Sequence, residues 1–81
     1  MLREIVAELQ VGDYRLFLLD SELPKKQYNK LVIDDVEYML VIVYDLPKSV
    51  AIKTNSSKSF VGEIVEFKND LSVSYWADNS P

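Results

Sequence analysis

The sequence predicts an all-β protein, a small closed or partly open β-barrel of about six to seven short antiparallel strands. Three observations support this fold class. Short segments alternate apolar and polar residues, turn-forming residues separate these segments, and the run Val36–Tyr44 is apolar at eight of its nine positions. A strand that is apolar on both faces must be covered on both, and closing the sheet into a barrel provides that cover. The 81 residues make a single domain over 1–81, with a loose tail at 78–81.

The first two predicted strands, 4–11 and 14–20, are joined by a turn at Gly12 and Asp13. Alternation in the first strand places four apolar side chains on one face: Ile5, Ala7, Leu9 and Val11. The second strand carries apolar side chains on both faces, which indicates an interior strand. The composition of residues 2–11 also favours a helix, and this alternative would make the fold α+β.

The run Val36–Tyr44 follows a polar connection and the short apolar segment Leu31–Ile33. The two residues between these apolar segments, Asp34 and Asp35, predict a hairpin with a primed turn and are interpreted as turn carboxylates. We expect Val36–Tyr44 to be an interior strand, with Val41 buried near its centre. The alternative interpretation is a seam between two copies of the chain.

The rest of the chain predicts three further strands: 50–54, 60–68 and 71–77. Phe60–Lys68 also fits a helix, which is the second α+β alternative. As a strand it needs a bulge, most simply at Gly62, to bring Glu63 and Glu66 to the same side. In the last strand, alternation points four side chains inward: Leu71, Val73, Tyr75 and Ala77.

The composition excludes most catalytic machinery. The chain contains no His, no Cys and only two glycines, which lie fifty residues apart. Disulfides, thiolate zinc sites, Ser-His or Cys-His nucleophiles and glycine-rich phosphate loops are therefore absent. We expect no catalytic residues, no metal site, no cofactor and no enzymatic activity.

The charge and hydropathy of the chain bear on its location and partners. The formal net charge is −4, with an acidic beginning and end and a basic middle. An acidic chain is a poor ligand for nucleic acid, whose binding depends on neutralising phosphates. No stretch approaches the ~18 apolar residues of a membrane span, and no signal-peptide pattern is present. We expect a cytoplasmic protein that does not bind membranes.

Three lysines with a tyrosine among them are the only basic cluster in the sequence: Lys25, Lys26, Tyr28 and Lys30. Basic side chains beside an aromatic ring are typical of surfaces that follow a phosphate backbone and stack a base. The same residues are also common in a solvated loop. This cluster is the basis of an alternative function, a small nucleic-acid-binding β-barrel that uses the loop 25–30.

Trp76, the only tryptophan, is the candidate anchor for a protein interface. Alternation in the last predicted strand places it on the outer face, and exposed tryptophans are often central to interfaces. The other interpretation is that it packs over the mouth of the barrel. The sequence therefore predicts a small non-enzymatic interaction module that binds another protein or itself. Its candidate binding residues are Trp76, Tyr28, Lys25, Lys26 and Lys30.

Overall fold

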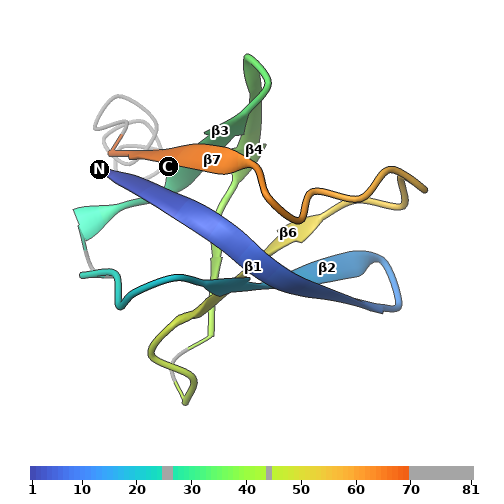
Figure 1. The fold of residues 1–81 in the computed structure, drawn as a ribbon, viewed down its shortest axis with the longest axis horizontal. Coiled ribbons are helices and arrows are strands. Elements are labelled where there is room, and N and C mark those ends of the chain that lie inside the picture. The colour runs from blue at the N-terminus through green and yellow to red at the C-terminus, as the bar shows by residue number, and fades with distance from the viewer. Residues whose placement is uncertain (25–26, 44, 70–81) are drawn as a thin grey trace, which may run out of the picture.

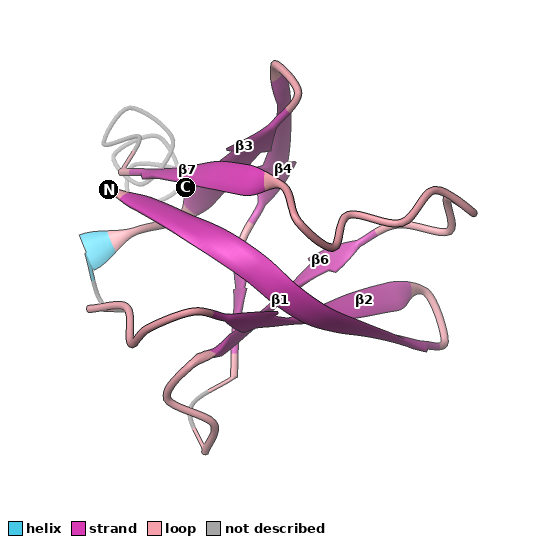
Figure 2. Cartoon of the chain, viewed as in Figure 1, coloured by secondary structure: helices cyan, strands magenta, loops and turns pink. Residues whose placement is uncertain are grey.

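The computed structural model describes residues 1–24, 27–43 and 45–69, and within these ranges the chain forms β-strands, a short 3₁₀ turn at Gln27 and no α-helix (Figures 1 and 2). The strands are β1 Leu2–Val11, β2 Tyr14–Leu19, β3 Lys30–Ile33, β4 Val36–Met39, β5 Val41–Ile42, β6 Ser49–Lys53 and β7 Ile64–Lys68. The all-β prediction is confirmed. Both helix alternatives are wrong, because residues 2–11 form β1 and the segment 60–68 contains β7.

The seven strands form one antiparallel sheet in the order β4-β3-β7-β1-β2-β6-β5. Of the two predicted forms, a closed or a partly open barrel, the closed one is wrong, since β4 and β5 are the two edges of this sheet and do not pair with each other. These edges are nevertheless consecutive in the sequence. The chain passes from one edge to the other through Leu40, whose backbone N–H donates to Asn29 O at 3.0 Å.

The prediction that Val36–Tyr44 is buried on both faces is also wrong. Leu40 is buried, but Val36, Met39 and Val41 are exposed. The physical reason is the sheet order: β4 and β5 each lie at an edge, so only their inner side chains reach the core. The interior strands with apolar residues on both faces are instead β1 and β2.

Two hairpin turns have the conformations that their sequences favour. Asp34 and Asp35 have φ angles of 50° and 66°, and two positive φ angles in a two-residue turn are the mark of a primed turn, as predicted. Gly12, with φ 59°, begins the turn that joins β1 to β2. Each turn fixes the register of the strands on either side.

A β-bulge interrupts β1 between Ile5 and Ala7, where the pairing with β2 shifts by one residue. Ile5 is fully buried, but beyond the bulge Leu9 and Val11 are exposed and Glu8 is half-buried. The prediction that Ile5 shares a face with Leu9 and Val11 is therefore wrong. Apolar residues continue at every second position through the bulge. They face the core before the bulge and the solvent after it.

The core lies inside the curved sheet and draws side chains from both edges of it. Its buried members are Ile5, Phe17, Leu19, Leu23, Leu31, Ile33, Leu40, Val50, Ile52, Phe60, Val65 and Phe67. Phe60 contacts Phe17 edge-on, with 5.7 Å between the ring centroids, and contacts Tyr38 at 6.4 Å. Phe60 therefore links β2 to the edge strand β4 through the interior.

The segment before β7 is a turn around Gly62, whose φ is 91°. The predicted bulge within a strand 60–68 is therefore wrong, because Gly62 lies in a turn that precedes the strand, which begins only at Ile64. Glu66 faces outward on β7, whereas Glu63 precedes the strand. The predicted strand 71–77 and the tail 78–81 lie outside the described residues.

Candidate functional site

The outer surface of the sheet is apolar over β5, β6, β2 and the part of β1 beyond the bulge. The outward cross-strand pairs between β1 and β2 are Ala7–Leu18, Leu9–Leu16 and Val11–Tyr14. The pairs that continue this surface onto β6 and β5 are Leu18–Ser49, Leu16–Ala51, Tyr14–Lys53 and Val41–Ala51. We call these residues the apolar half of the outer face. They include no Asp or Glu, and Lys53 is the only charged residue among them.

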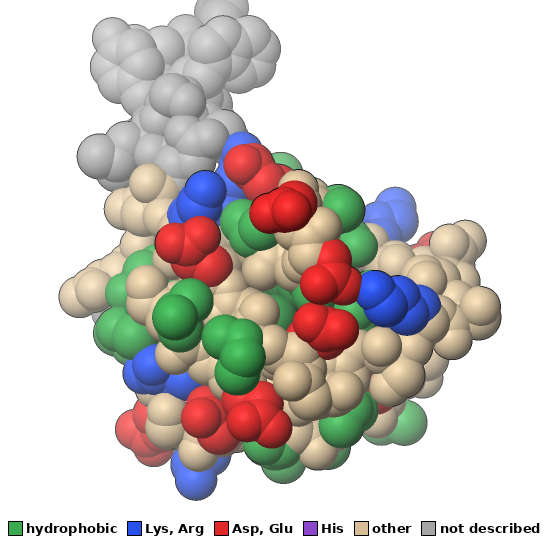
Figure 3. Space-filling model, turned by 45° about the horizontal axis from the view of Figure 1, so that its top comes forward, with side chains coloured by type: hydrophobic (Ala, Val, Ile, Leu, Met, Phe, Trp, Pro, Cys, Tyr) green, Lys and Arg blue, Asp and Glu red, His purple; other side chains and the backbone are tan. Residues whose placement is uncertain are grey.

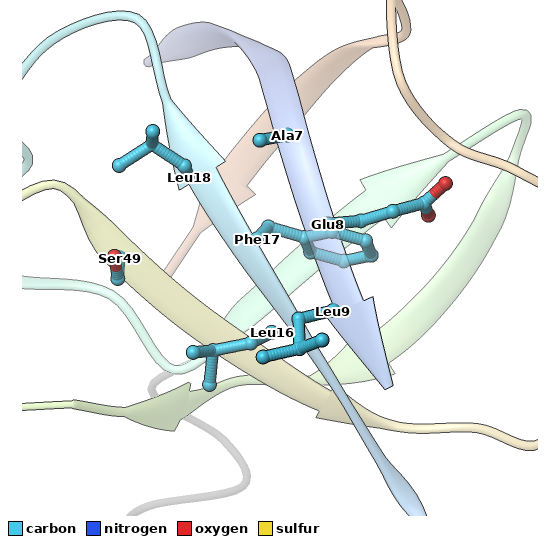
Figure 4. A pocket seen from close by; sticks show the side chains of 7 residues that line it. All are labelled: Ala7, Glu8, Leu9, Leu16, Phe17, Leu18 and Ser49. Atoms are coloured by element: carbon cyan, nitrogen blue, oxygen red, sulfur yellow. The ribbon is translucent and has the colours of Figure 1, made fainter. Parts of the chain in front are cut away.

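Several large side chains in the apolar half are exposed to solvent, with Leu9 the most exposed at 62%. Leu18 stands between two small neighbours, Ala7 on β1 and Ser49 on β6. These small residues leave a shallow hollow of about 120 Å³, which Glu8, Leu9, Leu16 and Phe17 also line, with the Glu8 carboxylate pointing away from Leu18 (Figure 4). A second hollow of about 240 Å³ adjoins it, lined by Leu18, Leu46, Pro47, Lys48 and Ser49. The surface therefore has an aliphatic ridge with a depression on each side.

The inner side of the same hairpin carries a polar cluster centred on the buried Arg15. Its guanidinium donates to Glu8 Oε1 at 2.7 Å and to the backbone oxygen of Lys58 at 3.0 Å, and it also donates to the Gln10 side chain and to Ser56 O. No buried side-chain nitrogen or oxygen lacks a hydrogen-bond partner in the described part of the chain. Beyond the bulge, Glu8 and Gln10 point toward Arg15, whereas Leu9 points outward.

Glu8 has a lowered pKa. Burial alone would raise the pKa of this carboxyl, but the Ser59 hydroxyl, the backbone N–H of Phe60 and the Arg15 guanidinium all donate to it and outweigh burial. The cluster also ties the loop 55–59 to β1 and β2. Glu8 is therefore a structural carboxylate that is ionised at neutral pH and has its acceptor oxygens occupied.

The outer face on the other side of the bulge is different in chemistry. Here, over β4, β3, β7 and the start of β1, most outward pairs join an apolar residue to a charged one: Leu2–Glu66, Glu4–Ile64, Val32–Glu66, Val32–Glu37 and Lys30–Met39. Lys30 Nζ also forms an ion pair with Glu37 at 3.0 Å. We call this surface the charged half. Figure 3 brings forward the region of β3, β4 and β7, where acidic side chains are interspersed with apolar ones.

Of the five predicted binding residues, the structure describes two. Tyr28 is half-buried and packs against the core residue Phe67, with 6.1 Å between the ring centroids. Lys30 is a β3 residue engaged by Glu37. Because of these contacts, the Tyr28 ring and the Lys30 ammonium do not form one exposed surface together. Lys25, Lys26 and Trp76 lie outside the described residues.

Other features of the described chain give weaker candidates. A polar hollow of about 290 Å³ lies at the tip of the β1–β2 hairpin, lined by Asp13, Lys53, Thr54 and Asn55. Thr54 N–H already donates to Asp13 O there, at 2.9 Å. Residues 1–24, 27–43 and 45–69 contain no group of three acidic side chains placed to hold a metal ion, and no helix able to cross a membrane.

Comparison of the chain with protein-family models, curated proteins and solved structures gives no match. The candidate site therefore depends on geometry alone. Sequence reasoning missed the apolar half because it assigned Leu9 and Val11 to the face of Ile5. The two-residue turn between β1 and β2 contained a signal that could have found this surface. The turn pairs Val11 with Tyr14 and Leu9 with Leu16, and Leu16 lies on the opposite face of β2 from Phe17.

Proposed function

We propose that this protein is a small non-enzymatic interaction module that binds a protein partner through the apolar half of its outer face. The observation that carries the proposal is the run of outward cross-strand pairs on four adjacent strands, most of them apolar on both sides, with no carboxylate among them. In a sheet with one solvated face, outward positions are usually polar. A contiguous exposed apolar patch with a polar rim is a common mark of a protein interface.

The arrangement of the hairpin strengthens the proposal. The apolar residues face out while Glu8, Gln10 and Arg15 occupy the inner side of the same two strands. Placing a charged cluster inside and leucines outside is unfavourable for an isolated monomer, because burying apolar surface contributes about 25 cal/mol per Å² and exposing it forfeits that. Covering the apolar half with a partner recovers this free energy. A protein partner suits an aliphatic surface better than a nucleic acid does, because nucleic-acid binding needs basic side chains.

A photocrosslinking experiment tests the proposal and does not require the partner to be identified first. Photoreactive p-benzoylphenylalanine replaces Leu9 in one variant and Ile64 in another, and the cells that express each are irradiated. Leu9 and Ile64 are matched, since both are strand residues and are 62% and 56% exposed. We expect a discrete protein adduct from position 9 and little from position 64. Equal adducts from both positions, or none from position 9, would contradict the proposal.

A further inference from the structure

We infer that the occupant of the apolar half is a second copy of this chain, which packs face to face to form a symmetric dimer. The inference rests on the proposed function, and it names the partner. Three properties of the apolar half support a second copy: its shape, the absence of an outward carboxylate from its cross-strand pairs, and its area.

The shape of the apolar half is self-complementary. Leu18 projects between its small neighbours Ala7 and Ser49, and a hollow lies on either side of it. The smaller hollow, about 120 Å³, is close to the cavity of roughly 150 Å³ that truncation of a buried leucine leaves. A two-fold axis in the plane of the interface lets Leu18 of each copy enter the hollow of the other. Such reciprocal contacts are what an isologous interface requires.

The charge distribution also favours a second copy. Each chain carries −4, so two copies repel unless their acidic groups stay apart. The apolar half has no outward Asp or Glu, whereas Glu4, Glu37 and Glu66 lie on the charged half. Packing through the apolar half therefore keeps these carboxylates away from the interface. Raising the salt concentration should leave this dimer unchanged or strengthen it, because salt screens the remaining repulsion.

The area of the apolar half fits a weak dimer. Three strands of about five residues and the two-residue β5, about 4.8 Å apart and at about 3.4 Å per residue, cover roughly 280 Å². Two such surfaces, once their side chains interdigitate, bury less than about 1,000 Å² in total, which is the range of weak, transient interfaces. We therefore expect a reversible dimer with a dissociation constant in the micromolar range, not a permanent assembly.

Sedimentation equilibrium of the purified full chain, from micromolar to millimolar concentration, tests the inference. We expect a monomer–dimer equilibrium in the wild type. Leu9→Glu and Leu18→Glu should each raise the dissociation constant by at least about 30-fold, because each puts a carboxylate into the interface. The matched control Ile64→Glu, on the charged half, should change it by less than about 3-fold. Circular dichroism of each variant confirms that the exposed substitutions leave the fold intact.

The outcomes separate this inference from the proposed function. A wild type that stays monomeric at every concentration overturns the dimer, and so does a dimer that Ile64→Glu weakens as much as Leu9→Glu does. If a monomeric protein still gives an adduct with a different protein from position 9, the interaction module stands and the second copy is replaced by another partner. If the protein forms the expected dimer, photocrosslinking from position 9 should also give an adduct with twice the mass of the chain.

Discussion

The apolar and charged halves of the outer face are formed by one sheet, share the strand β1 and cover the same core. They differ in how their outward residues are paired. In the charged half most apolar residues lie opposite a charged one, as Ile64 lies opposite Glu4, which is typical of a solvated surface. In the apolar half Leu9 lies opposite Leu16, and the charged groups of the hairpin point inward instead.

This difference shows what a single β-bulge can do. One additional residue in β1 moves every following side chain to the opposite face, so Glu8 goes inside and Leu9 goes outside. Strand β1 thereby supplies the core at one end and a surface patch at the other. If the residues of the two halves, and those beneath them, also contribute differently to stability, matched substitutions in the two halves should change stability by different amounts.

The largest effect is expected where the chain crosses between the two edges. Leu40 is 8% exposed and Val41 is 37% exposed, although they are neighbours in sequence. Leu40→Asp must bury a carboxylate in the core, and we expect it to lower the free energy of unfolding by about 4 kcal/mol. Val41→Asp should cost about 1 kcal/mol, since it only alters an edge-strand surface. Urea titrations measure both.

Leu40→Asp could consume most of the stability of a small domain, for which about 4–12 kcal/mol is ordinary. Leu40→Ala, at about 2–3 kcal/mol, keeps the comparison measurable if the aspartate variant does not fold. Equal losses for the Leu40 and Val41 variants would mean that the run Val36–Tyr44 is buried on both faces after all.

The second effect compares the ion pair that lies beneath the apolar half with the one on the charged half. Arg15 and Glu8 have side chains only 8% and 17% exposed, whereas those of Lys30 and Glu37 are 23% and 52% exposed. Glu8→Ala leaves the buried guanidinium without its counter-charge, and we expect a loss of about 3 kcal/mol. Glu37→Ala should cost less than about 1 kcal/mol, because water screens an exposed pair. A similar loss in both variants, measured by urea unfolding, would remove this distinction between the halves.

Much of the architecture could be predicted from the sequence, because turns and alternation are local properties. The primed turn at Asp34–Asp35 and the turn at Gly12 and Asp13 are both found where the sequence places them. Sheet order is not local. Nothing in the run Val36–Tyr44 indicates that its two parts pair with different neighbours at opposite edges, so its apolar character was interpreted as burial.

The candidate site could be predicted less well for the same reason. The bulge in β1 leaves no gap in the alternation, and the choice of inner face depends on a long-range contact between Arg15 and the loop oxygens at Ser56 and Lys58. The sequence does show that Arg15 is the one charged residue within the apolar segment 14–19. A buried arginine requires several acceptors, but which segment supplies them is a property of the folded chain.

The third effect is a difference in acid stability. The pKa of Glu8 is lower in the folded chain than in the unfolded chain, so ionised Glu8 stabilises the fold fully above the ordinary glutamate pKa of about 4.3. This contribution is lost as the pH falls through the lowered pKa. Glu8→Gln should therefore reduce the loss of melting temperature between neutral pH and about pH 3.

The control for this comparison is Glu66→Gln, which changes an exposed carboxylate on the charged half. We expect its melting temperature to follow the wild-type curve with pH. Thermal scans at a series of pH values measure all three proteins. If Glu8→Gln also follows the wild-type curve, the carboxylate beneath the apolar half does not contribute to acid stability.

The smallest effect concerns the hairpin turns of the two halves, which place different residues at positive φ. Asp35, in the charged half, has φ 66°, a conformation that costs most residues roughly 1–2 kcal/mol and glycine almost nothing. Asp35→Gly should therefore raise the free energy of unfolding by up to about 1 kcal/mol, because glycine also increases the entropy of the unfolded chain. Asp34 is left in place, since its carboxylate pairs with Lys58 Nζ at 2.7 Å.

Gly12, at φ 59° in the turn of the apolar half, is the reverse case. An added Cβ there meets no atom within 4 Å, so Gly12→Ala should lose about 1 kcal/mol through backbone strain alone. Urea unfolding measures the stability of both variants, and we expect the two substitutions to change the free energy of unfolding with opposite signs. A stabilising Gly12→Ala or a destabilising Asp35→Gly would mean that the turn in question does not hold the positive φ. For the β1–β2 turn that result would also challenge the register that sets Leu9 opposite Leu16, and with it the apolar half itself.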